Sequence, residues 1–393
     1  MTLRFDLTPL LPTAFAPRTE PLNKRMRFGA WAGYRTALCY GDTEMEYAAI
    51  RNTAMLYDLC PMTKYRISGV EAEDYLQRLM LRHLRKHSVG GVQYSLWCDD
   101  AGKVLDDGTL FRLGPQEFLL FCQERHLPWL LDSAMGFDVR VVDQTTDLAG
   151  LSLQGPLAAT ILAKAGLEVS SLKPFRLTHL PLGAGQVMIS RTGFTGDLGY
   201  ELWVTPDHAL TLWDRLIEAG AAYGLRPAGS DALNIARIEA GFLIATLDFI
   251  PAHHALREDR ARSPFELGFG WMVDFDKGPF TGRRALLRER ETGSRWARVG
   301  LDIPGNVAAE GALLYHLRKH EVGHVTSAVW SPITKRSIAL AEVQARHARG
   351  YDVWVEIYAE RELQYAKLML PVTVVERPFF NPARKRATPP ERF

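Results

Sequence analysis

The sequence has few cysteines and lacks any long apolar run. Four cysteines are scattered over 393 residues, with no CxxC pair and no zinc-ligand spacing among them. Such cysteine usage in a long chain is typical of a reduced, intracellular protein. No window approaches the apolar length that crosses a bilayer, and residues 1–17, interrupted by three prolines, lack the pattern of a secretory signal. We therefore expect a cytoplasmic protein with no membrane partner.

The sequence also lacks an excess of either charge and several common catalytic motifs. The net charge is only +2, which gives no sign of the one-sided basic field that nucleic-acid partners require. No GxSxG elbow is present, which excludes the serine hydrolases that depend on it. No N-terminal GxGxxG fingerprint is present either, so we expect no flavin-binding dehydrogenase domain in this chain.

What the sequence has is enough apolar material for two or three domains, since 47% of the residues are hydrophobic. Two stretches alternate strand and helix patterns, which indicates sheets covered by helices. The first has predicted strands at 65–68, 92–98, 104–113, 117–122 and 138–142, and helices at 71–81 and 127–134. The second has predicted strands at 150–154, 186–191 and 200–204, and helices at 157–165 and 209–222.

From about residue 297 the pattern changes to short alternating segments separated by turns, which predicts a small β-barrel or sandwich. The predicted strands are 298–303, 312–316, 323–329, 338–343, 353–357 and 364–370. The segment after Pro378 is basic and rich in proline, and we expect it to be poorly ordered.

Two carboxylates stand in an apolar strand, where aspartate is uncommon. Asp106 and Asp107 must point to opposite faces of that strand, because side chains alternate along it. A carboxylate that faces a covered side needs a hydrogen-bond donor or a cation as partner, or its pKa rises. A hairpin turn at Asp107-Gly108 is an equally good interpretation of the pattern.

The segment 191–201, RTGFTGDLGYE, places three glycines between two strands. No GK[ST] follows and no helix begins there, so we interpret it as a long hairpin rather than a phosphate-binding loop. Glu201 lies in the apolar strand that follows, on the face opposite Tyr200 and Leu202. There its carboxylate could accept N–H bonds from an aminopyrimidine ring.

Two histidine motifs resemble metal sites, and we expect neither to bind a metal. Residues 320–324, HEVGH, match the zinc-protease pattern, but that pattern works only on a helix and this segment continues as a strand. His253 and His254 are adjacent, and two adjacent side chains cannot both ligate an ion on one regular surface. They lie in a polar insert that we interpret as a solvated loop, with a contact to the substrate as the minority alternative.

Together these segments resemble the glycine-cleavage T-protein (aminomethyltransferase) superfamily, the folate-dependent one-carbon transferases and demethylases. No single match is specific, but eight occur in order with compatible spacing. They are AIRNTAMLYD at 49–58 with Met62 after it, DDAGKVLDD at 99–107 after Tyr94, LQGP at 153–156, RTGFTGDLGYE at 191–201, RIEAG at 237–241, SPFELGFGW at 263–271, FTGR at 280–283 and TSAVWSP at 326–332.

The resemblance implies an α+β fold of three domains around a channel for tetrahydrofolate. The expected domains are a discontinuous folate-binding domain at 1–60 plus 145–290, a ferredoxin-like domain at 61–144 and a C-terminal barrel at 291–377, followed by a tail at 378–393. The implied partner is a small-molecule donor or a lipoyl carrier protein.

The resemblance also implies the site residues. By motif position Asp106 is the catalytic aspartate near the folate nitrogen N10, and its charge would stabilise positive charge that develops during carbon transfer. Glu201 would bind the pteridine, with Tyr94, Met62, Trp271 and Arg237 as further cofactor contacts. His253 and His254 are the candidates for a contact with the substrate.

This sequence departs from the family pattern at two places near the expected site. The family's Ser-His before methionine is Cys60-Pro61 here, and its pteridine-contacting arginine is Leu233. The insert between Gly241 and Ser263 is also longer than in the glycine-cleavage enzyme. The donor is therefore either the aminomethyl-lipoyl arm or a small methylated compound. The alternative function is a non-catalytic folate-binding protein that assists iron–sulfur assembly, although the cysteine that marks those proteins is missing between 237 and 248.

Overall fold

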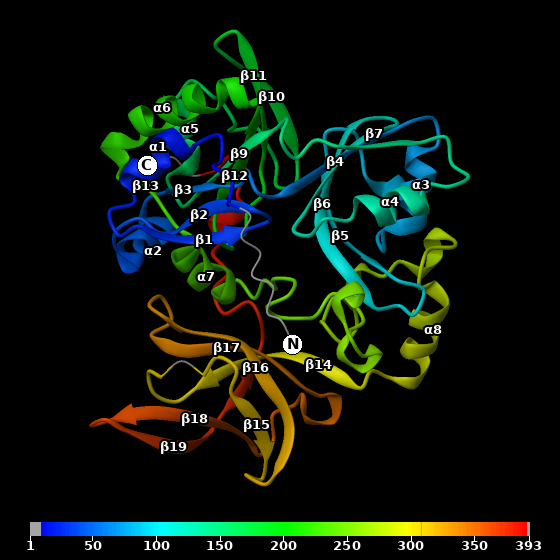
Figure 1. Ribbon diagram of the computed structural model, residues 1–393, viewed down its shortest axis with the longest axis vertical. Helices are drawn as coiled ribbons and strands as arrows, with labels where there is room; N and C mark the ends of the chain where they lie inside the picture. The colour runs from blue at the N-terminus through cyan, green and yellow to red at the C-terminus, as the bar shows by residue number, and fades with distance from the viewer. Residues whose placement is uncertain (1–8, 308, 391–393) are drawn as a thin grey trace.

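The computed structural model describes residues 9–307 and 309–390, which form three blocks around a common centre (Figure 1). Two blocks combine a sheet with helices, and the third is a curled sheet of seven strands. The predicted α+β fold with a barrel-like C-terminal sheet is confirmed. The exact domain bounds remain a prediction. The six-stranded sheet nevertheless combines strands from before and after the five-stranded sheet in the sequence.

The six-stranded block has a sheet that is covered on both faces. Its strands, in spatial order, are β10 (Leu177–Leu182), β11 (Gly185–Ser190), β12 (Gly199–Val204), β9 (Ala149–Gln154), β3 (Met55–Asp58) and β13 (Arg226–Pro227). Helices α5 (Ala158–Lys164) and α6 (Ala209–Gly220) pack on one face. The other face meets α2 (Thr43–Asn52) and α7 (Ser230–Glu239). The central strand β9 is buried at all six positions, as expected for a strand covered on both faces.

Local features at the first residues of α2 and α7 determine where each helix begins. The Asp42 carboxylate caps α2 by accepting hydrogen bonds from the N–H groups of Glu44 and Met45. Gly229 precedes α7, and a Cβ at this position would lie 2.2 Å from the carbonyl oxygen of Leu38. A glycine is therefore required where the chain passes the hairpin of β1 (Arg27–Trp31) and β2 (Tyr34–Cys39).

The five-stranded block has an antiparallel sheet with helices on one face only. Its strands, in spatial order, are β5 (Val92–Cys98), β6 (Val104–Gly114), β7 (Glu117–Cys122), β4 (Thr63–Ser68) and β8 (Arg140–Asp143). Helices α3 (Ala72–Leu79) and α4 (Leu127–Ser133) pack on it around Tyr65, Tyr75 and Trp97. The opposite face of β5–β7 is turned toward the six-stranded block (Figure 1).

The seven-stranded block is a curled antiparallel sheet at the lower end of the molecule (Figure 1). Its strands, in spatial order, are β19 (Gln364–Pro371), β18 (Val353–Arg361), β15 (Leu313–His316), β16 (His320–Ser331), β17 (Arg336–Gln344), β14 (Trp296–Ile303) and β20 (Thr373–Val375). The HEVGH motif lies entirely in β16, where His320 pairs with His316 and His324 with Leu313. The prediction that this motif continues as a strand is confirmed.

The polar insert, residues 242–262, folds between the blocks through turns and short 3₁₀ helices rather than through a regular element. One of these, η5 (Ala252–His254), lies against β6, and Ala252 packs on the core of the five-stranded block. Helix α8 (Arg283–Thr292) then leads into the seven-stranded block. In the described part of the chain, no helix has the length and apolar character needed to cross a membrane.

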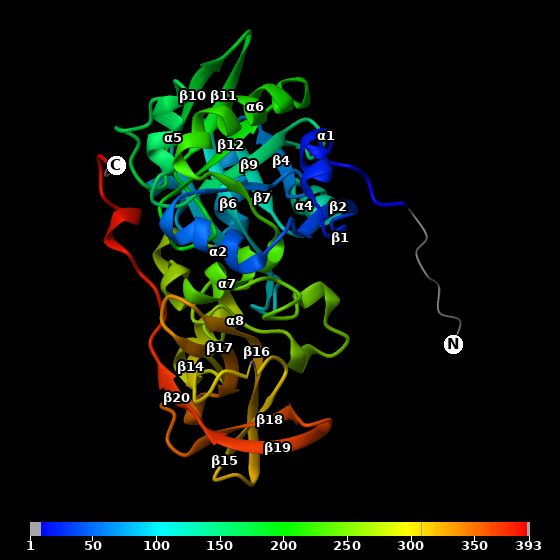
Figure 2. The same ribbon diagram turned by 90° about the vertical axis from the view of Figure 1, so that its left-hand side faces the viewer.

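The expectation that the chain after Pro378 is poorly ordered is wrong for residues 378–390. This tail leaves β20 and runs back along the six-stranded block (Figure 2). The Phe380 N–H donates to the carbonyl of Glu239, and the Arg191 guanidinium donates to the carbonyls of Lys385 and Ala387. Composition indicated disorder, but specific backbone acceptors hold the tail in place.

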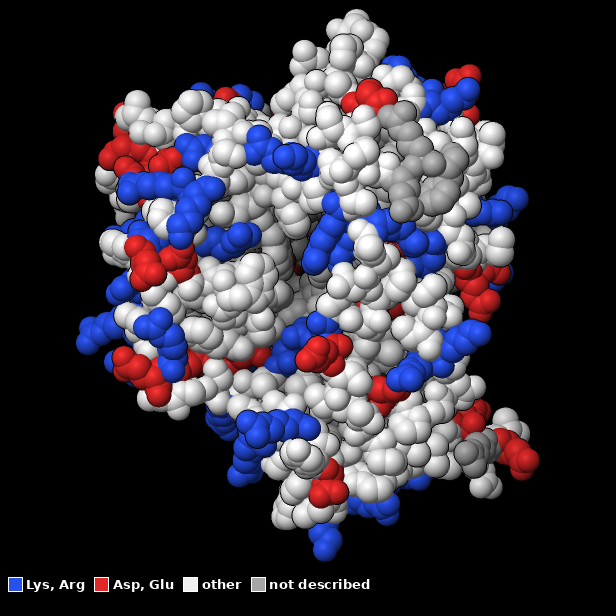
Figure 3. Space-filling model, turned by 180° about the vertical axis from the view of Figure 1, so that it is seen from behind, with Lys and Arg blue, Asp and Glu red and all other residues white. Residues whose placement is uncertain are grey.

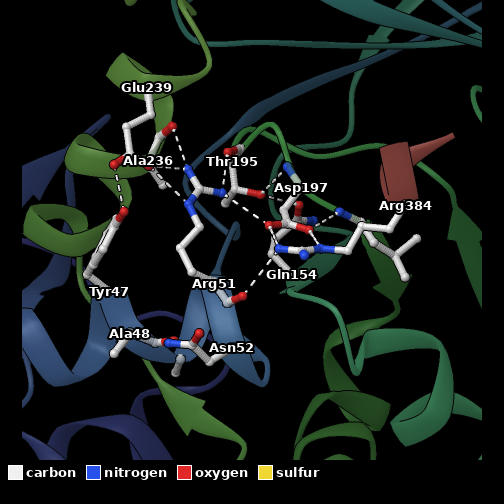
Figure 4. Close-up of polar contacts among 12 residues, drawn as sticks. Tyr47, Ala48, Arg51, Asn52, Gln154, Thr195, Asp197, Ala236, Glu239 and Arg384 are labelled. Atoms are coloured by element: carbon white, nitrogen blue, oxygen red, sulfur yellow. Dashed lines mark hydrogen bonds and ion pairs between the residues drawn. The ribbon is translucent and has the colours of Figure 1, made fainter. Parts of the chain in front are cut away.

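The same tail completes a buried ion network centred on Arg51 (Figure 4). The Arg51 guanidinium lies 2.6 Å from the Glu239 carboxylate and 3.4 Å from that of Asp197. Asp197 is also paired with Arg384 of the tail, at 2.7 Å. The network joins α2, α7, the 191–201 hairpin and the tail. These buried ion pairs therefore hold four segments that are distant in the sequence in contact with one another.

Candidate active site

The candidate site lies where the five-stranded sheet faces the six-stranded block. The two faces meet through aromatic rings: Phe121 of β7 lies 4.2 Å from Trp203 of β12 between ring centroids, and 4.7 Å from Phe111 of β6. Viewed from behind, the molecule is hollowed between these two blocks, and Lys and Arg side chains gather on the rim (Figure 3). The three rings are buried and form an apolar wall at this junction, and partly buried apolar side chains around it continue the wall toward the hollow.

Asp106 points away from this wall, into the core of the five-stranded block. Its side chain is 0% exposed, and its carboxylate accepts hydrogen bonds from the N–H of Asp107 (2.8 Å), the N–H of Glu124 (3.0 Å) and Nε2 of His126 (3.0 Å). Burial raises the pKa of Asp106, whereas the backbone N–H donors act in the opposite direction. The geometry thus gives the predicted catalytic residue a structural role.

Asp107 lies on the other face of β6, the face it shares with Thr109 and Phe111. It is half-buried, and the Tyr94 hydroxyl donates to its Oδ2 at 2.8 Å. Burial, followed by the charge of Asp106, raises the pKa of Asp107 to about 7. We assign the proton of the pair to Asp107, because Asp106 accepts three hydrogen bonds from N–H groups and Asp107 accepts one from a hydroxyl.

Glu201 projects from β12 on the same face as Trp203, as predicted from its alternation with Tyr200 and Leu202. It is half-buried, and the Thr192 hydroxyl donates to its Oε2 at 2.6 Å. Burial raises the pKa of Glu201. One carboxylate from each block therefore faces the apolar wall.

Met62 and Leu233 line the same space from two other elements. Both are partly buried against the aromatic cluster that contains Trp203. The chain at Met62 is held by the buried ammonium group of Lys64, which donates to the Met62 carbonyl at 2.8 Å. At Leu233 the family's charged contact is replaced by an apolar side chain that adds to the wall.

Trp271 lies at the edge of the site rather than inside it. Its side chain is 68% exposed, with the Arg82 guanidinium 5.6 Å from the ring centroid. Arg82 also donates to the carbonyl of Tyr94 at 3.2 Å, which links the exposed ring to the strand that carries Tyr94. Sequence reasoning missed Arg82, because nothing in its local pattern separates it from the neighbouring basic residues.

Arg237 has no access to this space. Its side chain is 0% exposed and donates to Asp248 (2.5 Å), Ser327 (2.7 Å) and Asn234 (2.9 Å). It ties α7 to the insert and to β16. The cofactor contact predicted for Arg237 is therefore not supported, and the contacts of its side chain are those of a structural arginine.

His253 and His254 are also separate from Asp107 and Glu201. They lie on η5, where the His253 ring is 5.0 Å from the ring of His126, the partner of Asp106. They thus stand on the Asp106 side of β6, and the contact with a substrate in the channel that was considered for them is not supported by this placement.

Two family models match the chain. The GCVT N-terminal domain matches residues 21–277, and the glycine cleavage T-protein C-terminal barrel domain matches residues 297–381. The chain belongs to the glycine cleavage T-protein family. This family carries out folate-dependent one-carbon transfer, and the chain is an enzyme of the transferase class.

Named relatives of this T-protein family member are enzymes. An aminomethyltransferase of Caldanaerobacter subterraneus is 33% identical over 326 residues, which cover 81% of this chain and 84% of that protein. A trimethylamine-oxide aldolase of Ruegeria pomeroyi is 34% identical over 355 residues, 87% of this chain. The match spans only 43% of the length of the aldolase.

A solved structure supports the same fold. The aminomethyltransferase of the Bartonella henselae glycine cleavage system is similar over 95% of this chain and 98% of its own, with a TM-score of 0.83 and 25% identity. Together with the enzyme names of the relatives, this favours the transferase over the non-catalytic iron–sulfur assembly protein.

Proposed function

We propose that this T-protein family member transfers a one-carbon unit from a small amine to tetrahydrofolate, with Asp107 as the carboxylate next to the reacting atoms. One observation carries the proposal: Asp107 and Glu201 are half-buried carboxylates on facing sheets, each with a hydroxyl donor, beside one apolar wall. Such a site can hold a flat ring and act on a nitrogen that gains positive charge.

The residues present fit the folate that the family uses. The Glu201 carboxylate keeps acceptor capacity beyond the Thr192 hydroxyl, and amino-pyrimidine N–H groups need such an acceptor. The partly buried side chains of Met62 and Leu233 would pack on the faces of the ring. Tetrahydrofolate, when bound, supplies the nitrogen atoms that accept the carbon.

Asp107 supports the transfer through its charge and its position. As the carbon leaves the donor nitrogen and bonds to the folate nitrogen, positive charge develops at the carbon. Asp107 stabilises this charge once the aspartate pair has lost its proton and Asp107 is ionised. The Tyr94 hydroxyl orients the carboxylate by its 2.8 Å hydrogen bond. Asp106 acts as a positioning residue, since it binds the backbone N–H of Asp107 from the other side of the strand.

A carbon bound to nitrogen is the donor chemistry that the relatives favour. The names of these relatives, aminomethyltransferase and trimethylamine-oxide aldolase, both describe such a group. We therefore place small N-methylated amines ahead of sulfonium and methoxy compounds. A lipoyl carrier protein that presents an aminomethyl group is the alternative partner.

The test is incubation of the protein with tetrahydrofolate and a panel of donors under anaerobic conditions, with folate products identified by mass spectrometry. The panel holds methylated glycines, trimethylamine oxide, an aminomethyl-lipoyl carrier, dimethylsulfoniopropionate and a methoxybenzoate. We expect methyl-tetrahydrofolate from a methylated glycine, whose methyl carbon moves without a change of oxidation state while the amine keeps the electron pair and takes up a proton. Trimethylamine oxide and the aminomethyl-lipoyl carrier, whose carbon reaches the formaldehyde level without an added oxidant, should give methylene-tetrahydrofolate. Folate binding without product from any donor would favour the non-catalytic function instead, and a failure to bind folate would refute the proposal.

A further inference from the structure

A group of metal-ligating side chains lies outside the proposed folate site, at the junction between η5 and the connection from β7 to α4. Glu124, His253 and His254 each offer one ligand atom, and these three atoms lie within 4.8 Å of one another. The His253 and His254 rings are 4.2 Å apart, and Nε2 of His254 lies 3.5 Å from the Glu124 carboxylate.

The sequence-based objection to this pair does not apply to the observed backbone. Adjacent residues diverge on a strand or a long helix, but His253 and His254 end a three-residue 3₁₀ turn and both rings face the Glu124 loop. Ala252, the first residue of that turn, packs on the core of the five-stranded block. The turn is therefore anchored, while the two imidazoles remain exposed.

We propose that Glu124, His253 and His254 bind one divalent transition-metal ion of the zinc class. Two imidazoles and one carboxylate are a ligand set that zinc uses, with a fourth position left to water. With zinc–ligand bonds of about 2.0–2.1 Å, neighbouring ligand atoms in a tetrahedral site are about 3.4 Å apart. The separation of 3.5 Å between His254 and Glu124 already matches this edge.

The groups behind the ligands hold the ligand loop in place. The Asp106 carboxylate accepts a hydrogen bond from the backbone N–H of Glu124 at 3.0 Å and a second one from Nε2 of His126 at 3.0 Å. The centroid of the His126 ring lies 5.0 Å from that of His253. Asp106 thus fixes the backbone of the loop that carries Glu124.

A bound ion would fasten the insert to the five-stranded block. His253 and His254 belong to the 242–262 insert, whereas Glu124 belongs to the connection after β7. The site lies on the Asp106 side of β6, away from Asp107. Metal binding is thus distinct from folate binding, and either can fail in an experiment without the other.

The test is equilibrium dialysis of the full chain against Zn²⁺, with bound metal counted by mass spectrometry. We expect one ion per chain. His254→Ala and Glu124→Gln should each weaken binding by more than the roughly 10- to 100-fold that loss of an outer partner costs. The matched control is His316→Ala with His347→Ala, because these rings are 4.6 Å apart but belong to no group of three ligands among the described residues.

Thermal unfolding provides a second readout that does not depend on activity. Zn²⁺ should raise the melting temperature of the wild type and of the control, and should leave that of His254→Ala unchanged. The metal-free His254→Ala variant should melt with the metal-free wild type, since His254 is exposed. Absence of stoichiometric Zn²⁺, or binding that the two ligand variants retain in full, would overturn the proposal.

Discussion

At the scale of single residues, the two neighbouring aspartates differ because a strand has two faces. Asp106 accepts three hydrogen bonds from N–H groups in a closed core, and Asp107 meets Tyr94 in a half-buried space. Two residues of the same type thus take separate roles, one structural and one chemical.

Glu201→Gln should weaken tetrahydrofolate binding by roughly 10- to 100-fold, the equivalent of one hydrogen bond to a charged group. The amide keeps the size of the side chain but loses charge and acceptor capacity. Calorimetric titration measures the effect, with Glu218→Gln on the exposed face of α6 as the matched control. Equal affinity in wild type and Glu201→Gln would remove Glu201 from the site.

The rate constant kcat/KM should fall roughly tenfold per pH unit as pH drops below about 7, because protonation of Asp107 removes the charge that the transfer needs. The pKa of Asp107 is raised by burial and by Asp106, while the Tyr94 hydroxyl lowers it. Activity is therefore present above this pKa and lost below it. A pH–rate profile checks the prediction, and a flat profile between pH 6 and 8 would contradict it.

At the scale of elements, Asp106 connects β6 to the loop that follows β7, because its carboxylate accepts hydrogen bonds from both segments. Asp106→Ala leaves the N–H of Glu124 and the ring of His126 without their acceptor in a buried place. We expect the free energy of unfolding to fall by about 3 kcal/mol. Urea unfolding measures this loss.

In the same urea unfolding experiment, Asp107→Asn should not lower the free energy of unfolding. The folded-state pKa of Asp107 is raised to about 7 from the ordinary value of 3.8, so its ionised form opposes folding at pH 8. The variant should be at least as stable as the wild type at that pH while losing activity. A large loss of stability in Asp107→Asn would contradict the division of roles between the two aspartates.

Elements with strong periodicity could be predicted from the sequence. The strand expected at 104–113 is β6 (Val104–Gly114), and the helix expected at 209–222 is α6 (Ala209–Gly220). Alternation also gave the side of Glu201 correctly. Alternation could not show which of Asp106 and Asp107 faces the candidate site. It places their side chains on opposite faces of the strand but does not say what covers each face.

Irregular segments were the least predictable. The approach of His253 and His254 to Glu124 depends on a 3₁₀ turn inside a charged insert, for which no periodic signal exists. The ordering of residues 378–390 depends on partners more than 130 residues away in sequence, such as Arg191 and Asp197. Amino-acid composition does not show which distant residues form hydrogen bonds and ion pairs with the tail, nor which loop lies next to the 3₁₀ turn.

At the scale of the whole molecule, the buried network of Arg51 joins segments from both ends of the chain (Figure 4). Arg51→Met would leave the carboxylates of Glu239 and Asp197 buried with one cation fewer. We expect a loss of about 3–5 kcal/mol in the free energy of unfolding. Arg18→Gln, which breaks the exposed pair with Asp214, is the control and should cause no measurable change. Equal effects of the two variants would contradict the role of the network.

The most direct test of the central claim follows one labelled carbon. A donor amine carrying ¹³C on its N-methyl group, chosen from the panel above, is mixed with the protein and tetrahydrofolate, and the label is traced by mass spectrometry in a single turnover. Asp107→Asn should slow the appearance of labelled folate by roughly 10²- to 10³-fold. Asp302→Asn in the seven-stranded block, whose carboxylate pairs with Arg336, should match the wild type. Label in the folate at an undiminished rate in Asp107→Asn would contradict the account.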